Sequence, residues 1–211
     1  MRILVTGGAG YIGSMLVEKL LLTPTYHVTV VDSLYYGQSP FGSEFLNPRF
    51  TFIKGDVRDN SLMAQLEKNA DVIIPLAALV GAPICNLDPV GADSVNKMAI
   101  LDLFRRVSKD QFVIMPTTNS AYGSGVADGF CDETSPLNPI SKYAIDKVEV
   151  EKVLMDLDFS VSFRLATVFG MSRRMRLDLL VNDFCYRAMT DGFMVLYEGH
   201  FRRNFIHVQD V

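Results

Sequence analysis

The chain has 211 residues, is 49% hydrophobic and carries a formal net charge of −4, so it can bury a core but has no basic excess for nucleic acid. No apolar stretch approaches the roughly 20 residues of a membrane span, and the N-terminus begins as a strand rather than as a signal peptide. The 3 cysteines include no CxxC pair and the 3 histidines lack metal-ligand spacing, so we expect reduced thiols, no metal site and a cytoplasmic location.

The first predicted elements are a strand, a glycine turn and a helix. Arg2–Thr6 is a short run of mostly apolar and β-branched residues, and Tyr11–Leu22 has the amphipathic spacing of a helix. Between them, Gly7, Gly10 and Gly13 follow the spacing G-x-x-G-x-x-G. This arrangement lets backbone N–H groups approach a pyrophosphate at the positive end of a helix.

A second predicted strand ends in an acidic residue. Val28–Val31 is an apolar run that leads directly to Asp32, roughly 20 residues beyond the glycines. A carboxylate in this position is expected to bind the hydroxyl groups of a ribose. Glycine is also common in ordinary tight turns, but the strand, the helix and the acidic residue together favour a dinucleotide site.

The rest of the chain continues to alternate between strands and helices. Further strands are predicted over Phe50–Lys54, Asp71–Leu76, Gln111–Met115 and Ser160–Leu165. Helices are predicted over Asp59–Lys68, Asp88–Lys109 and Ser141–Asp156. Regular alternation of this kind predicts an α/β fold, a doubly wound parallel sheet of the Rossmann type with helices on both faces. Ligands of such sheets bind at the carboxyl ends of the strands.

Tyr143 and Lys147 form the pattern Y-x-x-x-K on the predicted helix Ser141–Asp156, which places both side chains on one face. A phenol has an ordinary pKa of about 10, which is too high for a base at neutral pH. A nearby ammonium, together with the positive charge of an oxidised nicotinamide, would lower the pKa of Tyr143 and let it take a proton from a substrate hydroxyl. The alternative is an ordinary exposed Tyr/Lys pair. The position of the motif in a dinucleotide-binding α/β chain favours catalysis.

Polar residues follow the predicted strand Gln111–Met115 at the carboxyl edge of the sheet. They are Thr117, Thr118, Asn119 and Ser120. A hydroxyl group here could donate a hydrogen bond to a substrate oxygen and stabilise the charge that develops on it. The alternative is that these residues only cap a helix or form a turn.

Short motifs run along essentially the whole chain in a fixed order. They are TGGAGYIGS (Thr6–Ser14), Asp32, GDVRD (Gly55–Asp59), LAA (Leu76–Ala78), Asn96, PTTNSAYG (Pro116–Gly123), YAIDK (Tyr143–Lys147), FRLATVFG (Phe163–Gly170) and RNFIHVQD (Arg203–Asp210). With these motifs the chain resembles the extended short-chain dehydrogenase/reductase family, in particular its NAD-dependent nucleotide-sugar epimerases and dehydratases. The resemblance implies a Rossmann domain over residues 1–170 and the start of a smaller substrate-binding lobe over 171–211. Members of the family usually continue further, so we expect this lobe to be truncated.

The resemblance also implies roles for residues at matching positions. The catalytic residues would be Thr118, Tyr143 and Lys147. NAD would be bound by Gly7, Gly10, Tyr11, Ile12, Gly13, Asp32, Asp56, Val57, Leu76, Ala77, Ala78, Asn96, Tyr143 and Lys147. A nucleotide-diphosphate sugar would be bound by Thr118, Asn119, Thr167, Asn182 and Arg203. Asp32 favours NAD over NADP, because a carboxylate would repel a 2′-phosphate. Asp56 could equally be a turn residue, and Asn96 a polar residue buried in its helix.

Departures from the family pattern narrow the expected reaction. Dehydratases carry an acid among the two residues after the catalytic Thr, and this chain has Asn119 and Ser120 there. Neither side chain can act as a carboxylic acid–base group, so water elimination is disfavoured. The cysteine of the fucose-synthase-like branch is also replaced by Ser120. In the family pattern R-x-x-N-x-x-G, the position of the asparagine is occupied by Thr167 in this chain. This replacement changes one expected contact with the substrate.

The expected function is therefore oxidation and reduction at sugar C4. A C4 epimerase is the first hypothesis, a 4-ketoreductase the second, and a non-catalytic NAD-binding protein the third. The resemblance also implies a homodimer formed through the helices Asp88–Lys109 and Ser141–Asp156. Additional arginines follow the FRLATVFG motif or precede RNFIHVQD, and a solvated basic surface is the favoured interpretation for Arg173, Arg174, Arg176 and Arg202.

Overall fold

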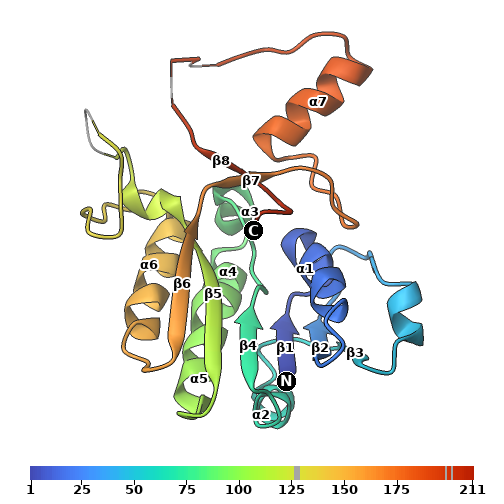
Figure 1. Cartoon of the computed structure of the whole chain (residues 1–211). Coiled ribbons are helices and arrows are strands. Elements are labelled where there is room, and N and C mark those ends of the chain that lie inside the picture. Colours follow the sequence, from blue (N-terminus) through green and yellow to red (C-terminus); the bar gives the residue numbers. More distant parts are fainter. Residues whose placement is uncertain (126–128, 198, 201) are drawn as a thin grey trace.

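The central feature of the computed structural model, which describes residues 1–125, 129–197, 199–200 and 202–211, is a sheet of 6 parallel strands (Figure 1). The strands are β1 (Arg2–Thr6), β2 (His27–Asp32), β3 (Phe50–Lys54), β4 (Val72–Pro75), β5 (Phe112–Thr118) and β6 (Ser160–Leu165). They lie in the order β3-β2-β1-β4-β5-β6, which is the Rossmann order, and the strand order reverses between β1 and β4. All six predicted strands are confirmed. Strand β5 runs further than predicted, to Thr118.

Helices cover both faces of the sheet because alternate residues of each strand point to opposite sides. On one face, Ile3 and Val5 pack with Val17 of α1 (Tyr11–Leu21). On the other face, Leu4 belongs to a core that receives side chains from three helices. These helices are α2 (Asn60–Glu67), α5 (Ala99–Arg106) and α6 (Lys142–Leu154). The predicted helix ends were close, since Asp59 and Ser141 are the N-caps of α2 and α6.

The long helix predicted over Asp88–Lys109 is interrupted. It consists of α4 (Pro89–Asp93), a π-helical turn η2 (Ser94–Met98) and α5, and it ends at Arg106. The short helix α3 (Ala82–Leu87), which the sequence did not predict, precedes it. The π turn contains Asn96, whose amide is fully buried and bonds to the backbone of Leu79. A tertiary contact therefore sets the irregular turn, and the apolar spacing alone does not reveal it.

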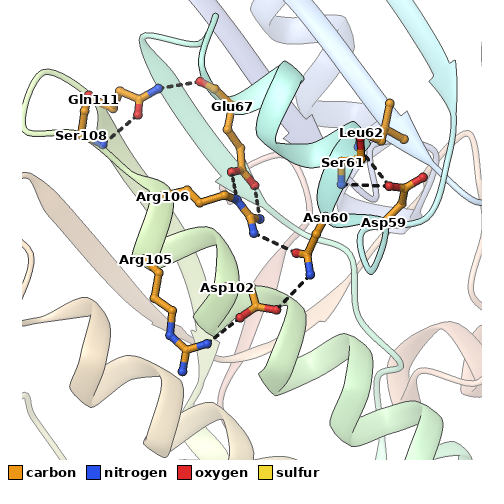
Figure 2. Close-up of polar contacts among 10 residues, drawn as sticks. All are labelled: Asp59, Asn60, Ser61, Leu62, Glu67, Asp102, Arg105, Arg106, Ser108 and Gln111. Atoms are coloured by element: carbon orange, nitrogen blue, oxygen red, sulfur yellow. Dashed lines mark hydrogen bonds and ion pairs between the residues drawn. The ribbon is translucent and has the colours of Figure 1, made fainter.

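A polar network joins α2 to α5 at the amino ends of the strands (Figure 2). Arg106 donates two hydrogen bonds to the carboxylate of Glu67, at 2.6 and 2.9 Å, and a third to Asn60 Oδ1 at 2.8 Å. The Gln111 side chain donates to the backbone carbonyl of Glu67 at 2.6 Å. The Glu67 side chain is only 2% exposed, so its charge is neutralised inside the fold rather than by water.

A second, two-stranded sheet lies beyond the carboxyl ends of the main sheet (Figure 1). It pairs β7 (Thr167–Phe169) with β8 (Phe205–His207), and α7 (Leu180–Thr190) lies between them in the chain. The short 3-10 helices are η1 (Ser43–Leu46) and η3 (Asn119–Tyr122). In the ranges that the structure describes, no helix is long and apolar enough to cross a membrane.

Candidate active site

A cavity of about 640 Å³ opens at the carboxyl ends of β1, β2, β3, β4 and β5. Most of the residues predicted from the sequence line it: Gly7, Gly10, Tyr11, Ile12, Gly13, Asp32, Asp56, Val57, Leu76, Ala77, Ala78, Thr118, Asn119, Tyr143, Lys147 and Thr167. They come from the turn after β1 and the start of α1, from the ends of four further strands, from α6 and from β7. The fold thus gathers at one edge residues that are far apart in the sequence, as expected for a parallel sheet.

The glycine turn forms a floor made of backbone. Gly7 has a φ of +67°, and a Cβ atom on it would lie 2.5 Å from the backbone nitrogen of Ala77. A Cβ on Gly13 would lie 2.6 Å from the Cα of Gly8, so α1 packs directly against the turn. Gly10 is the N-cap of α1 and provides no side-chain cap, and the first turn contains no acidic residue. The first N–H groups of the helix therefore point to the cavity without a side chain to satisfy them.

Asp32 lies at the end of β2 and helps shape the same turn. Its carboxylate accepts hydrogen bonds from the backbone N–H of Ala9 at 2.9 Å and of Leu34 at 2.8 Å. Each oxygen uses one lone pair in this way, so the carboxylate can still accept from a ribose hydroxyl. Asp56 is more strongly engaged, because Arg58 binds both of its oxygens and lowers the pKa of Asp56.

The segment after β4 passes close to the glycine turn. Leu76 N–H donates to the backbone oxygen of Thr6 at 3.0 Å, and Ala77 N–H reaches the Thr6 hydroxyl at 3.3 Å. Asn96 supports this segment from behind. Its amide accepts from Leu79 N–H at 2.8 Å and donates to the Leu79 carbonyl at 2.9 Å. Asn96 does not line the cavity, so its geometry fits a role in holding the segment rather than in touching a ligand.

Tyr143 and Lys147 line the cavity from consecutive turns of α6. Lys147 is 5% exposed, and the Tyr143 ring is half-buried against a cluster that contains Leu79 and Cys85. Within the part of the chain that the structure describes, neither side chain makes a hydrogen bond or ion pair with another protein group. Both polar ends are therefore available to a ligand.

Burial, rather than the neighbouring charge, controls the pKa values of this pair. It raises the pKa of Tyr143 to about 12 and lowers the pKa of Lys147 to about 8. The predicted lowering of the Tyr143 pKa invoked Lys147 together with an oxidised nicotinamide and stays a prediction; in the polypeptide by itself, Lys147 is not among the groups that shift this pKa. Removal from water penalises the phenolate more than the surrounding charges favour it, and Arg176 is the group that acts to lower the pKa of Tyr143.

Thr118 is both a helix cap and a cavity residue with a hydroxyl that can bind a ligand, the two roles between which the sequence did not decide. It is 8% exposed, lines the cavity, and is the N-cap of η3, where its oxygen accepts from Ser120 N–H at 3.1 Å. Because that bond uses only a lone pair, the hydroxyl proton can still be donated to a ligand. Next to it, the Asn119 side-chain amide donates to Asn204 Oδ1 at 2.5 Å. The backbone carbonyl of Asn204 accepts from Thr167 N–H at 3.2 Å.

Two of the residues predicted to bind substrate do not reach the cavity. Asn182 is 5% exposed, and its amide is shared among Gly170 N–H at 2.9 Å, the Tyr11 hydroxyl at 3.2 Å and the Arg176 carbonyl at 2.9 Å. Arg203 is exposed and lies outside the lining. Asn182 therefore joins parts of the protein, and the geometry gives it no direct contact with a ligand in the cavity.

Two arginines that the sequence analysis assigned to a solvated surface belong to the cavity. Arg174 and Arg176 line the cavity, so a solvated surface is the wrong interpretation for them. The Cζ atom of Arg174 lies 3.9 Å from the centroid of the Tyr36 ring, and its buried Nε has no hydrogen-bond partner. Arg176 is held by Asp178 at 3.1 Å. The sequence signal for both residues was their position soon after β7, which by itself does not distinguish the wall of a cavity from a surface loop.

The family model described as "NAD dependent epimerase/dehydratase family" matches residues 3–211. The chain belongs to this family. A UDP-glucose epimerase of Bacillus subtilis, described as uncharacterised, is 31% identical over 100% of the chain and 70% of its own length. The crystal structure of UDP-glucose 4-epimerase from Thermotoga maritima with UDP-glucose matches with a TM-score of 0.83 and 29% identity. The match covers 100% of the present chain and 70% of the chain of that epimerase. A dTDP-glucose 4,6-dehydratase from Bacillus anthracis in complex with NAD has a TM-score of 0.85 and 25% identity, with 100% and 68% covered.

Epimerase/dehydratase family members are NAD-dependent enzymes, and NAD is accordingly the cofactor of this chain. The cavity fits such a dinucleotide in two respects. The uncapped N-terminus of α1 presents N–H groups that suit a pyrophosphate, and the glycines at positions 7 and 13 let the turn pack directly against Ala77 and Gly8, so that backbone forms this surface of the cavity. At the end of β2, Asp32 keeps lone pairs for a ribose.

Proposed function

We propose that the chain is an NAD-dependent nucleotide-sugar epimerase that acts at sugar C4 through a transient 4-keto sugar. The observation that carries this proposal is the meeting of Thr118, Tyr143 and Lys147 in one cavity with the glycine turn. These residues come from β5 and α6, and their functional groups keep unused hydrogen-bonding capacity. The arrangement suits removal of a proton from a hydroxyl beside a hydride acceptor.

Each polar group has a distinct part in this chemistry. Tyr143 acts as a phenolate whose Oη takes the proton of the C4 hydroxyl, and the phenol so formed later returns it. Lys147, with a pKa of about 8, is mostly an ammonium at neutral pH and stabilises the phenolate before it takes up the proton. The Thr118 hydroxyl donates to the C4 oxygen as its bonding changes. When bound, NAD supplies the hydride acceptor, and its positive ring adds to the charge that favours the phenolate.

Two features support epimerisation over dehydration. Asn119 and Ser120 follow Thr118, and neither carries a carboxyl group that could protonate a leaving hydroxyl. The Asn119 amide is also engaged with Asn204. Relatives of both reaction types match the chain to a similar degree, so these residues carry the distinction.

An arginine in the cavity wall supports a diphosphate as the second part of the substrate. The guanidinium group of Arg176, which acts on the pKa of Tyr143, provides donors in a geometry that suits phosphate oxygens. Since a structural relative was solved with UDP-glucose, UDP-sugars are the first substrates to test, followed by GDP-, dTDP- and CDP-sugars. Product analysis identifies the sugar. An epimerase interconverts two sugars with no net change in NADH absorbance, whereas a 4-ketoreductase consumes NADH in proportion to product.

Tyr143→Phe tests the catalytic assignment directly. The substitution removes the proton acceptor but keeps the ring, so turnover should fall by about 10²- to 10⁴-fold. Affinity for NAD, measured by titration, should change little. Tyr186→Phe is the matched control, because Tyr186 is exposed on α7 and lies outside the cavity. Equal turnover by Tyr143→Phe and the unmodified chain would refute the assignment.

A further inference from the structure

Residues 170–178, here called the cover segment, lead from β7 toward α7 and are attached to the N-terminal part of α1. The Ser172 hydroxyl donates to the Tyr11 carbonyl at 2.6 Å and lies 3.0 Å from the Ser14 hydroxyl. The Tyr11 hydroxyl donates in turn to the Gly170 carbonyl at 2.5 Å. One end of the cover segment is therefore fixed beside the glycine turn.

Arg173 fixes the cover segment at a second place, outside the cavity. Its guanidinium forms ion pairs with Glu44 of η1 and, at 3.2 Å, with Glu18 of α1. The Glu44 side chain is only 7% exposed, and its other oxygen accepts from Gly42 N–H at 3.0 Å. Burial acts to raise the pKa of Glu44, but the hydrogen bonds from the Gly42 backbone and Arg173 outweigh it, so the pKa is lowered and the carboxylate stays charged. Removing one partner of a partly buried pair costs more than removing one partner of a surface pair, because the other charge stays buried without its counter-charge.

The neighbours of Arg173 face the other way, into the cavity. Arg174 stacks on Tyr36, which follows β2, and Arg176 lies in the cavity wall. The cover segment thus makes contact with α1, with η1 and with the loop after β2, and it borders the space that the dinucleotide occupies. Arg173 does not line the cavity, so its influence on a ligand is indirect.

We propose that Arg173 is a positioning residue whose ion pair with Glu44 holds the cover segment across the cofactor cavity and thereby slows release of the dinucleotide. The inference rests on the proposed function in one respect, since an epimerase must keep its reduced cofactor until the hydride returns to the sugar. Breaking the pair frees the Arg173 end of the segment, and Arg174 and Arg176 then lose their fixed positions in the wall.

Release of NADH from the full chain tests the inference without any sugar substrate. The chain has no tryptophan, so NADH fluorescence can be followed free of that background while excess NAD displaces it. Arg173→Gln and Glu44→Gln should each accelerate release about tenfold, which corresponds to about 1.4 kcal/mol. The double variant should be no faster than the faster single variant, because both substitutions remove one contact. Arg173→Lys, which keeps the charge, should stay within about threefold of the unmodified chain.

Arg187→Gln is the matched control, because it breaks an exposed Arg–Asp pair on α7 and should leave the release rate unchanged. Release that stays within about twofold of the unmodified chain in both single variants would overturn the inference. So would equal acceleration by Arg187→Gln, or additive acceleration in the double variant. Since the readout is NADH release, a chain that shows these rates but epimerises no sugar would refute the proposed function and leave the role of Arg173 intact.

Discussion

At the scale of single residues, the sequence revealed which side chains form the site but not their protonation behaviour. The sequence predicted that Tyr143 and Lys147 would share a helix face, and both line the cavity. It did not predict that burial raises the pKa of Tyr143 and lowers that of Lys147, because these shifts depend on what surrounds the side chains. The cluster of Leu79, Cys85 and Ala92 that packs against Tyr143 comes from the segment between β4 and η2, which is far from α6 in the sequence.

The lowered pKa of Lys147 makes stability depend on pH. The folded value of about 8 lies below the ordinary value of 10.5, so the unfolded chain binds more protons between these values and stability rises with pH across that window. Lys147→Met removes this dependence. From about pH 7.5 to about pH 9.5, the free energy of unfolding should rise by about 2 kcal/mol more in the unmodified chain than in the variant.

Urea unfolding at the two pH values, without added cofactor, checks this expectation. Comparison with the variant cancels the other groups that titrate in the window. An identical pH dependence in the two proteins would show that Lys147 has an ordinary pKa. Tyr143 does not disturb the comparison, because its folded pKa of about 12 lowers stability only as pH rises above its ordinary value of 10.0.

Most cavity residues could be predicted because they belong to short local motifs. The glycine turn and Asp32 are such cases, since a strand, a turn and a helix fix their positions within about 30 residues. Arg174 could not be distinguished from a surface arginine. Its environment depends on Tyr36 and on the path of the cover segment, which no local pattern encodes.

At the scale of elements, the strands were predictable and the irregular helices were not. Apolar runs mark inner strands of the main sheet such as β1 and β4, because parallel strands are buried on both faces, whereas the edge strands β3 and β6 mix apolar with polar residues. The π turn at Asn96 depends on a contact with Leu79, which lies on another segment. Helix α3 has only 6 residues, too few to show a periodic pattern.

The contact between α2 and α5 allows a test of buried charge (Figure 2). Arg106→Met leaves the carboxylate of Glu67, 2% exposed, without its main partner, so the free energy of unfolding should fall by about 3 kcal/mol. Urea unfolding measures the change. Affinity for NAD should be retained, because neither residue lines the cofactor cavity.

Arg105→Met is the matched control on the same helix. Arg105 pairs with Asp102 but is 70% exposed, so its loss should cost less than about 1 kcal/mol. The double variant with Glu67→Met and Arg106→Met should be more stable than Arg106→Met alone, since no unpaired charge remains. Equal costs for Arg105→Met and Arg106→Met would contradict this account.

At the scale of the whole molecule, a few hydrogen bonds join α1, which packs on the main sheet, to α7 and to the residue after β7. Asn182 of α7 contacts both the Gly170 backbone after β7 and the Tyr11 hydroxyl of α1. The sequence placed the boundary between a Rossmann domain and a smaller lobe at residue 170, and this boundary stays a prediction, as does the homodimer. The second sheet itself begins earlier, at Thr167.

Asn182→Ala should loosen this junction. Three hydrogen bonds are lost and buried partners remain unsatisfied, so the free energy of unfolding should fall by about 2 kcal/mol. Amide hydrogen exchange should accelerate in residues 170–190 and remain unchanged in β1. Asn69→Ala, at an exposed position with one side-chain bond, should change stability by no more than about 0.5 kcal/mol. Uniform acceleration across the chain would argue against a local junction.

The backbone floor of the cavity has a consequence for redesign. Because Gly7 lies against Ala77 with no room for even a methyl group, mutation cannot install a side chain at this position of the floor. Any change of preference between cofactors has to be engineered at the perimeter, where Asp32, Tyr36 and Arg174 present replaceable side chains. Selectivity and the capacity to hold a dinucleotide at all are thus encoded in different parts of the polypeptide, and the first can evolve while the second stays constant.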